Sequence, residues 1–215
     1  MAKIEPVLAQ WLREHNKKKV ALIYNTGGAW YEVVAETVKR AVESAGGEIV
    51  FEEGVQFGSE AEVLPTTIAK LKNANADIIF SEIDDDQGIF VMLKKMKELG
   101  NTADIMSVTT SVGRVLNENS TSLGLENNFY ALAPKTSTAF QEHYMERYGT
   151  LPGAYADSAY DSLMLLVDAM KSRGNVPLEV YLKEETDYQG YANSYDFDEN
   201  GDILDGEWVV RTVGI

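Results

Sequence analysis

The chain has 215 residues, of which 45% are apolar and 25% are charged, and this balance is typical of a folded globular protein. Its formal net charge of -15 at pH 7 repels phosphate backbones, so nucleic acid is not expected as a partner. The sequence has no cysteine, which excludes disulfides and thiolate chemistry. We expect no signal peptide in this chain and no membrane span, because no apolar run approaches the roughly 18 residues that a span needs.

Short apolar runs alternate with amphipathic helical patterns along the first 135 residues. Five runs predict buried strands, at residues 20–24, 48–53, 77–80, 104–108 and 129–133. The helical patterns between them end at glycines such as Gly46 and Gly100, which are common helix stops. This alternation predicts an α/β fold, a Rossmann-like parallel sheet with helices on both faces.

The pattern changes to helices after residue 136. The predicted elements of this part are three helices marked by Phe140, Tyr144 and Tyr148, by Tyr160 to Met170 and by Leu178 to Leu182, and a β-hairpin formed by Tyr191 to Phe197 and Trp208 to Val213. We therefore divide the chain into residues 1–135, a Rossmann-like lobe, residues 136–190, a helical segment, and residues 191–215, a C-terminal hairpin that rejoins the first lobe.

Three stretches carry a family likeness by their order and spacing. They are Lys18 to Tyr24 with the Gly46-Gly47 stop, Leu71-Lys72 followed by Asp77 to Phe80, and a C-terminal set of Phe140, Tyr144, Tyr148-Gly149, Pro152, Ala159-Tyr160-Asp161, Phe197-Asp198 and Gly201-Asp202. Together they resemble the type 1 periplasmic solute-binding proteins, the branched-chain amino acid branch of ABC transport. The chain resembles the second lobe and the C-terminal segment, and it has no counterpart of the first half of lobe one.

The resemblance implies a protein that binds a small-molecule solute, an amino acid or an amine-like compound, and that has no catalytic activity and no cofactor. It implies a membrane permease complex as partner and a periplasmic or extracellular location. It also implies that Tyr160 is a ligand contact, because the start of that helix returns to the ligand cleft in the family. A single lobe provides only part of the contacts around a ligand, so we expect binding weaker than micromolar.

Side chains that follow the predicted strands form the candidate ligand site, since open α/β sheets bind ligands beyond the carboxyl ends of their strands. These side chains are Trp30 and Tyr31, then Asp84, Asp85 and Asp86, then Thr109. Aromatic rings beside carboxylates suit a cationic or amine-bearing solute. Two alternatives stay open: the acidic cluster can serve as a helix N-terminus with Asp86 as its cap, and Trp30 can be a core residue.

A calcium-loop pattern lies near the end of the chain. Asp196, Asp198, Asn200, Gly201 and Glu207 match its specified positions. A true calcium loop of this type has helices on both sides, whereas the flanking segments here have strand character, and Asn200-Gly201 is typical of a two-residue hairpin turn. We therefore expect a hairpin turn and no metal.

Two further hypotheses concern the class of protein and its assembly. Established nucleophile, zinc and phosphate-loop motifs do not occur, and the two histidines, His15 and His143, have the sequence context of solvated residues. The alternative to solute binding is a stand-alone flavodoxin-like domain with an assembly or regulatory role and no small-molecule site. Apolar helix faces around Phe140, Tyr144 and Leu163 to Val167 predict a homo-oligomer formed through the C-terminal helices.

Overall fold

The computed structural model describes residues 3–108, 123, 128–153, 155–184, 188–199, 201–204 and 206–212. The chain forms two compact units. Unit 1 comprises residues 1–133 and 209–215, and unit 2 comprises residues 134–208.

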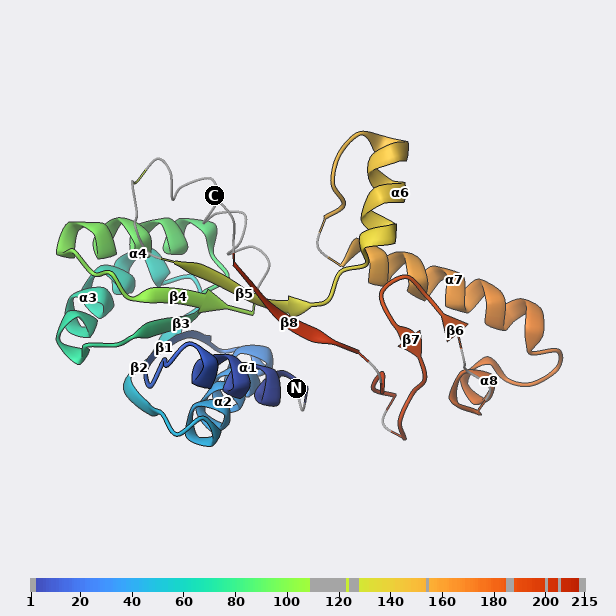
Figure 1. Ribbon diagram of the computed structural model, residues 1–215, viewed down its shortest axis with the longest axis horizontal. Helices are drawn as coiled ribbons and strands as arrows, with labels where there is room; N and C mark the ends of the chain where they lie inside the picture. Colours follow the sequence, from blue (N-terminus) through green and yellow to red (C-terminus); the bar gives the residue numbers. More distant parts are fainter. Residues whose placement is uncertain are drawn as a thin grey trace. The chain divides into compact units, whose positions relative to one another are not determined.

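Unit 1 is built on a six-stranded sheet with the strand order β2-β1-β3-β4-β5-β8. Its elements are α1 (Ile4–Glu14), β1 (Lys19–Thr26), α2 (Ala29–Ser44), β2 (Glu48–Gln56), α3 (Glu60–Leu71), the 3-10 helix η1 (Lys72–Ala74), β3 (Ile78–Glu82), α4 (Asp86–Leu99), β4 (Asp104–Ser107), β5 (Phe129–Pro134) and β8 (Trp208–Thr212) (Figure 1). The pairs β1–β2, β1–β3, β3–β4 and β4–β5 are parallel. The α/β fold with a mainly parallel sheet is therefore confirmed.

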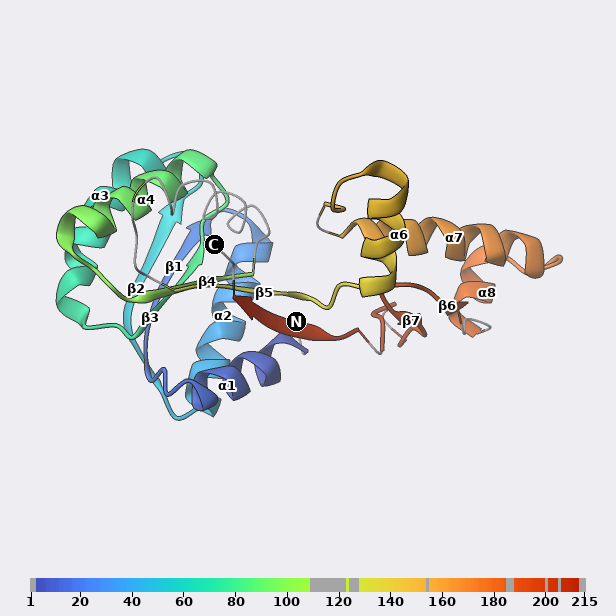
Figure 2. The same cartoon turned by 45° about the horizontal axis from the view of Figure 1, so that its top comes forward.

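Helices cover both faces of this sheet, α1 and α2 on one and α3 and α4 on the other (Figure 2). Successive strand residues point to opposite faces, so the two layers draw on alternate positions of β1. Ala21 and Ile23 are fully buried in the cluster that also contains Ile68 of α3 and Met92 of α4. A sheet buried on both faces explains why its strands appear in the sequence as continuous apolar runs.

Unit 2 contains three helices and a short two-stranded ladder. These elements are α6 (Thr138–Tyr148), α7 (Ala156–Ser172), α8 (Leu178–Glu184), β6 (Tyr188–Gln189) and β7 (Ser194–Tyr195). Ser137 caps α6, because its Oγ accepts a hydrogen bond from the backbone N–H of Phe140 at 3.2 Å. The backbone N–H of Ser137 in turn donates to the buried carboxylate of Asp157 at 3.2 Å, which links the starts of α6 and α7.

A β-hairpin forms at the predicted turn, but its arms differ from those expected. The backbone N–H of Asp198 donates to Asp202 O at 2.9 Å, and Phe197 pairs with Ile203. Three residues therefore lie between the paired positions instead of two, and Gly201 supplies the positive φ of 85° that this loop length requires. The segment expected as the returning arm, β8, instead pairs with β5 in the large sheet.

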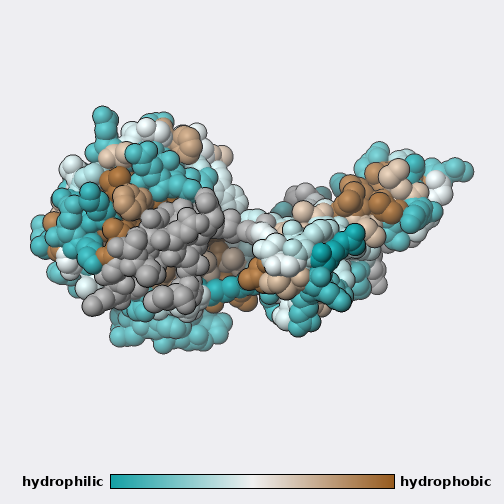
Figure 3. All heavy atoms as spheres, turned by 90° about the horizontal axis from the view of Figure 1, so that it is seen from above, coloured by the Kyte–Doolittle hydropathy of each residue, from teal (hydrophilic) through white to brown (hydrophobic). Residues whose placement is uncertain are grey.

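The expected exposure of the helical faces holds for α7 and not for Phe140. The Phe140 side chain is only 7% exposed, because the rings of Tyr144, Tyr160 and Tyr191 cover it, with centroids 5.5–5.9 Å away. On α7, by contrast, Leu163, Leu166 and Met170 are exposed at helical spacing, and Figure 3 shows hydrophobic surface along this helix.

Candidate functional site

A buried asparagine organises the carboxyl edge of the unit 1 sheet. Asn25 lies in β1, near its carboxyl end, and is fully buried. Its Nδ2 donates to Glu60 Oε1 at 2.7 Å, and its Oδ1 accepts from the backbone N–H of Asp84 at 3.0 Å. A buried amide without such partners would be costly, so this residue ties the ends of β1 and β3 to the start of α3. The network places Asp84 at the edge of the sheet.

Two of the predicted site residues meet at this edge. The Tyr31 hydroxyl, in the first turn of α2, donates to Asp84 Oδ2 at 3.1 Å. Burial and then the negative charge of Asp84 raise the pKa of Tyr31, so the phenol stays protonated and remains a donor. The neighbouring indole of Trp30 is 46% exposed, which excludes the alternative of a core residue. An exposed indole therefore accompanies a tyrosine–carboxylate pair on this edge.

The other two carboxylates of the acidic cluster have different surroundings. Asp85 is the N-cap of α4, because its Oδ2 accepts from the backbone N–H of Gly88. The expectation that Asp86 is the cap was wrong by one residue, since α4 begins at Asp86 and the preceding residue has the extended backbone of an N-cap. Asp86 lies in the first turn with an exposed side chain. The capping alternative thus applies to Asp85.

The end of the neighbouring strand is fixed by an acid that sequence reasoning missed. Glu82 is fully buried at the end of β3, and its Oε1 accepts from Ser107 Oγ at 3.0 Å and from the backbone N–H of Val108 at 2.6 Å. A carboxylate two residues after the apolar run of β3 was the available sequence signal. Thr109, the next residue after Val108, lies outside the described residues.

In unit 2, the aspartate of the Ala159-Tyr160-Asp161 motif is a buried anchor. Its Oδ1 accepts from the backbone N–H of Tyr191 at 2.8 Å, and its Oδ2 accepts from the backbone N–H of Ala192 at 2.6 Å and from the Tyr195 hydroxyl at 3.2 Å. Burial and then the Asp161 charge raise the pKa of Tyr195 to about 12. The carboxylate thus holds residues 190–195 against α7.

Glycine at position 190 allows this close approach. A Cβ atom at Gly190 would overlap the carboxylate of Asp161 and the ring of Tyr195. The side-chain-free backbone therefore lets the loop reach the anchor. The motif that marks the family likeness in the sequence thus has a structural function, which is to attach the β6–β7 loop to a helix.

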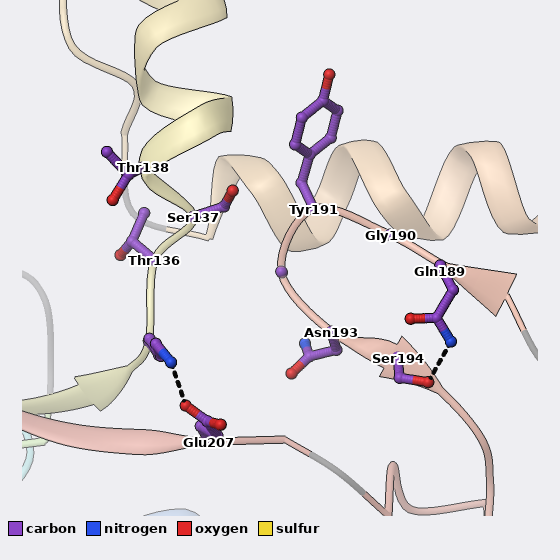
Figure 4. A pocket seen from close by; sticks show the side chains of 11 residues that line it. Thr136, Ser137, Thr138, Gln189, Gly190, Tyr191, Asn193, Ser194 and Glu207 are labelled. Atoms are coloured by element: carbon purple, nitrogen blue, oxygen red, sulfur yellow. Dashed lines mark hydrogen bonds and ion pairs between the residues drawn. The ribbon is translucent and has the colours of Figure 1, made fainter.

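A polar pocket of about 460 Å³ lies beside this loop in unit 2 (Figure 4). One wall carries the hydroxyls of Thr136, Ser137 and Thr138, and the opposite wall carries the amides of Gln189 and Asn193. Lys135 Nζ pairs with Glu207 Oε2 at 2.6 Å on the same rim. Hydroxyls, amides and a charged pair provide both donors and acceptors, so this pocket suits a polar molecule.

The residues of the calcium-loop pattern serve other interactions. Glu207 pairs with Lys135, and Asp198 Oδ1 accepts from the backbone N–H of Asp202 at 2.9 Å inside the hairpin turn. The backbone oxygen of Asp196 accepts from Leu204 at 2.8 Å, and Asn200 lies outside the described residues. Over the residues that the structure places, no three histidine or acidic side chains gather as a metal site.

Tyr160, the remaining predicted contact, belongs to unit 2. Its side chain is 44% exposed at the start of α7, and its ring lies 5.8 Å from those of Phe140 and Tyr191. Its role as a contact to a ligand on unit 1 stays a prediction.

Within the described ranges, none of the helices is long and apolar enough to cross a bilayer.

The architecture of unit 1 and the family model agree on the class of protein. The family model described as periplasmic binding protein matches residues 4–182, which is most of the chain, and the chain therefore belongs to this family. The likeness predicted from the sequence is confirmed. No curated protein matches the chain in a sequence comparison.

Several solved structures share the fold. The leucine binding protein of Thermotoga maritima matches with a TM-score of 0.79 at 17% identity, over 98% of this chain and 61% of its own. An ABC transporter substrate-binding protein of Desulfitobacterium hafniense in complex with Leu matches with a TM-score of 0.73 at 18% identity, over 97% of this chain and 62% of its own. A solute-binding protein of R. palustris in complex with benzoate matches with a TM-score of 0.76 at 13% identity, over 98% of this chain and 59% of its own. The chain thus spans about three fifths of the length of these proteins.

Proposed function

We propose that this protein binds a small-molecule solute without transforming it, at the carboxyl edge of the unit 1 sheet. Membership of the periplasmic binding protein family supports the class of activity. The residues that carry the site are Trp30, Tyr31, Asp84 and Asp86, together with Thr109, while Asp85 acts mainly as a helix cap. The solute delivered by the whole protein passes to a membrane permease complex, and the protein works in the periplasm or outside the cell.

The observation that carries the proposal is the pairing of Tyr31 with Asp84, together with the exposed Trp30 that precedes Tyr31 at the start of α2. An indole attracts a cation through its π face, and a carboxylate pairs with an ammonium group. This wall therefore favours a solute with a protonated amine, such as an amino acid or a simple amine. The leucine bound to the D. hafniense protein is one solute of this kind.

The sheet edge provides one wall around the solute, so its contribution to affinity is limited. A pocket that encloses most of its ligand gains both contacts and the removal of water, whereas one wall gains only part of each. We expect a dissociation constant weaker than about 1 μM for the chain alone, which corresponds to about 8 kcal/mol.

Three related solutes test the chemistry of the site by calorimetry. They are leucine, 3-methylbutylamine, which is leucine without its carboxylate, and 4-methylpentanoate, which is leucine without its amine. We expect both amines to bind and the carboxylate alone to bind at least about tenfold more weakly, because an unpaired anion would face the acidic edge. Asp84→Asn and Trp30→Ala should each weaken amine binding.

Asp168→Asn is the matched control, since it removes an exposed carboxylate from α7 in unit 2. It should leave the affinity for 3-methylbutylamine unchanged. Tight amine binding that survives both Trp30→Ala and Asp84→Asn would place the solute elsewhere and contradict the proposal. Preference for 4-methylpentanoate over the amine would contradict the proposed solute class.

A further inference from the structure

One face of α6 combines aromatic rings with a guanidinium group. Phe140, His143, Tyr144, Arg147 and Tyr148 follow the spacing i, i+3, i+4, i+7 and i+8, which places them along a single stripe of the helix. All five line one cavity of about 310 Å³ in unit 2. The acidic residues of α6 lie on its other faces and do not line this cavity.

The opposite wall comes from two tyrosines outside α6. Tyr160 projects from the start of α7, and Tyr191 lies in the loop that Asp161 anchors. Their rings lie 5.8 Å and 5.5 Å from the ring of Phe140, which forms the buried end of the cavity. We call this cavity the aromatic pocket. Because the wall residue Tyr191 is held by a buried carboxylate, the pocket exists before a ligand arrives.

Arg147 provides the positive charge of the aromatic pocket. The guanidinium carbon of Arg147 lies 5.7 Å from the centre of the Tyr148 ring, and among the described residues no carboxylate pairs with this guanidinium. His143 Nδ1 lies 2.9 Å from the Tyr191 hydroxyl, so this hydroxyl is oriented on the pocket wall. Among the described residues that line the cavity none is acidic, although the chain as a whole carries a charge of -15.

We propose that the aromatic pocket is a second binding site, for a small planar aromatic carboxylate. Tyr144 and Tyr148 provide ring surfaces for stacking, and Arg147 provides a guanidinium that pairs with a carboxylate through two N–H groups. The Tyr160 hydroxyl on the opposite wall donates a further hydrogen bond to the anion. The site is independent of the sheet edge in unit 1, and its ligand has the opposite charge to the solute proposed there.

Phenylacetate is a suitable probe, with phenylacetamide as its neutral isostere and 2-phenylethylamine as its cationic counterpart. In calorimetric titrations of the full chain we expect phenylacetate to bind with a dissociation constant of about 0.1–1 mM, a range typical of a ligand of this size in an open pocket. The amide and the amine should bind at least about tenfold more weakly, because neither forms the charge-assisted pair with Arg147.

Substitutions then locate the site. Arg147→Met should weaken phenylacetate binding at least about tenfold, whereas Arg147→Lys, which retains the charge, should recover most of it. Tyr148→Ala should also weaken binding, because it removes the exposed ring wall. Arg13→Met is the matched control, since it removes an exposed arginine from α1 in unit 1, and it should have no effect. Circular dichroism of each variant checks that unit 2 remains folded.

Three outcomes would overturn the proposal. They are the absence of saturable phenylacetate binding up to about 10 mM, well above the expected range, equal binding of all three probes, and unchanged binding in Arg147→Met. Loss of phenylacetate binding in Trp30→Ala would also overturn it by assigning the anion to unit 1. Failure of the amine titrations alone would contradict the sheet-edge site and leave this one intact, so the two proposals fail separately.

Discussion

The two compact units of the chain are stabilised by different interactions. In unit 1 the sheet is buried between two helical layers, and the largest fully buried side chains, from Ile4 and Leu8 to Ile89, all belong to it. In unit 2 the buried groups are fewer and include two carboxylates, Asp157 and Asp161, and an aromatic cluster around Phe140. Unit 1 is stabilised mainly by aliphatic packing on both faces of its sheet, whereas single polar anchors hold the loops of unit 2 in place.

This contrast indicates where each unit can bind a ligand. Aliphatic side chains fill the described interior of unit 1, and the carboxyl edge of its sheet presents Tyr31 and Asp84, where open α/β sheets bind ligands. Unit 2, in contrast, contains the polar pocket beside the β6–β7 loop and the aromatic pocket between α6, the start of α7 and Tyr191. Unit 1 thus combines a well-packed core with a binding surface at one edge, whereas unit 2 has a smaller core and these two pockets.

Removal of a core side chain from unit 1 should have the largest effect. Ile79 is fully buried in the central strand β3, so Ile79→Ala should lower the free energy of unfolding by about 2–5 kcal/mol through lost burial and a residual cavity. Val33→Ala removes a side chain that is 47% exposed and should cost less than about 0.5 kcal/mol. Urea unfolding followed by circular dichroism measures both. Equal effects of the two substitutions would contradict the packing described for unit 1.

Removal of the anchor from unit 2 should have the next largest effect, and a local one. Asp161→Ala leaves two backbone N–H groups and one hydroxyl without their acceptor, which should cost about 1.5–3 kcal/mol. Hydrogen exchange of the Tyr191 and Ala192 amides should accelerate, while amides of the unit 1 strands should be unaffected. Asp168→Asn on the exposed side of α7 is the control. Unchanged exchange at these two amides would show that the loop does not depend on Asp161.

Self-association should depend on the exposed face of α7 and not on unit 1. Leu163, Leu166 and Met170 form this face, and contiguous exposed apolar surface is a common contact between protein chains. We expect concentrated protein to form oligomers that Leu166→Glu disperses, whereas Ser172→Glu on the same helix should not. Sedimentation velocity measures the outcome. A strict monomer at high concentration would contradict the prediction.

The smallest expected effect is a shift in the pKa of Tyr195, which depends on the neighbouring Asp161 carboxylate. Tyr195 should titrate with a pKa of about 12, because burial and the charge of Asp161 both disfavour the phenolate. A folded-state pKa raised above the usual value of about 10 contributes stability that is complete below pH 10 and is lost as the pH rises toward 12. NMR of carbon-labelled tyrosine measures this value, and Tyr195→Phe identifies the signal. In Asp161→Asn the pKa should fall, and an unchanged value would contradict the role of the Asp161 charge.

Local patterns in the sequence were sufficient for the elements of unit 1. The five predicted strands and the helices between them are present, because each depends on the spacing of apolar residues within about ten positions. The same patterns, in their order, were sufficient to predict the family. The strand predictions also placed Trp30, Tyr31 and Asp84 at the carboxyl edge of the sheet, since the carboxyl ends of parallel strands meet there.

Other features required partners that are distant in the sequence. The anchor of Asp161 needs amides thirty residues further along the chain, and β8 pairs with β5 instead of with the segment that precedes it. Burial of Phe140 likewise depends on Tyr160 and Tyr191. The buried side chains of Asn25 and Glu82 find their hydrogen-bond partners at the ends of neighbouring strands. The sequence by itself determined the elements, their order and the family, because propensity and periodicity act between near neighbours. Only the tertiary structure decided which strands pair and which side chains enclose the pockets, because those contacts depend on the packing of the whole chain.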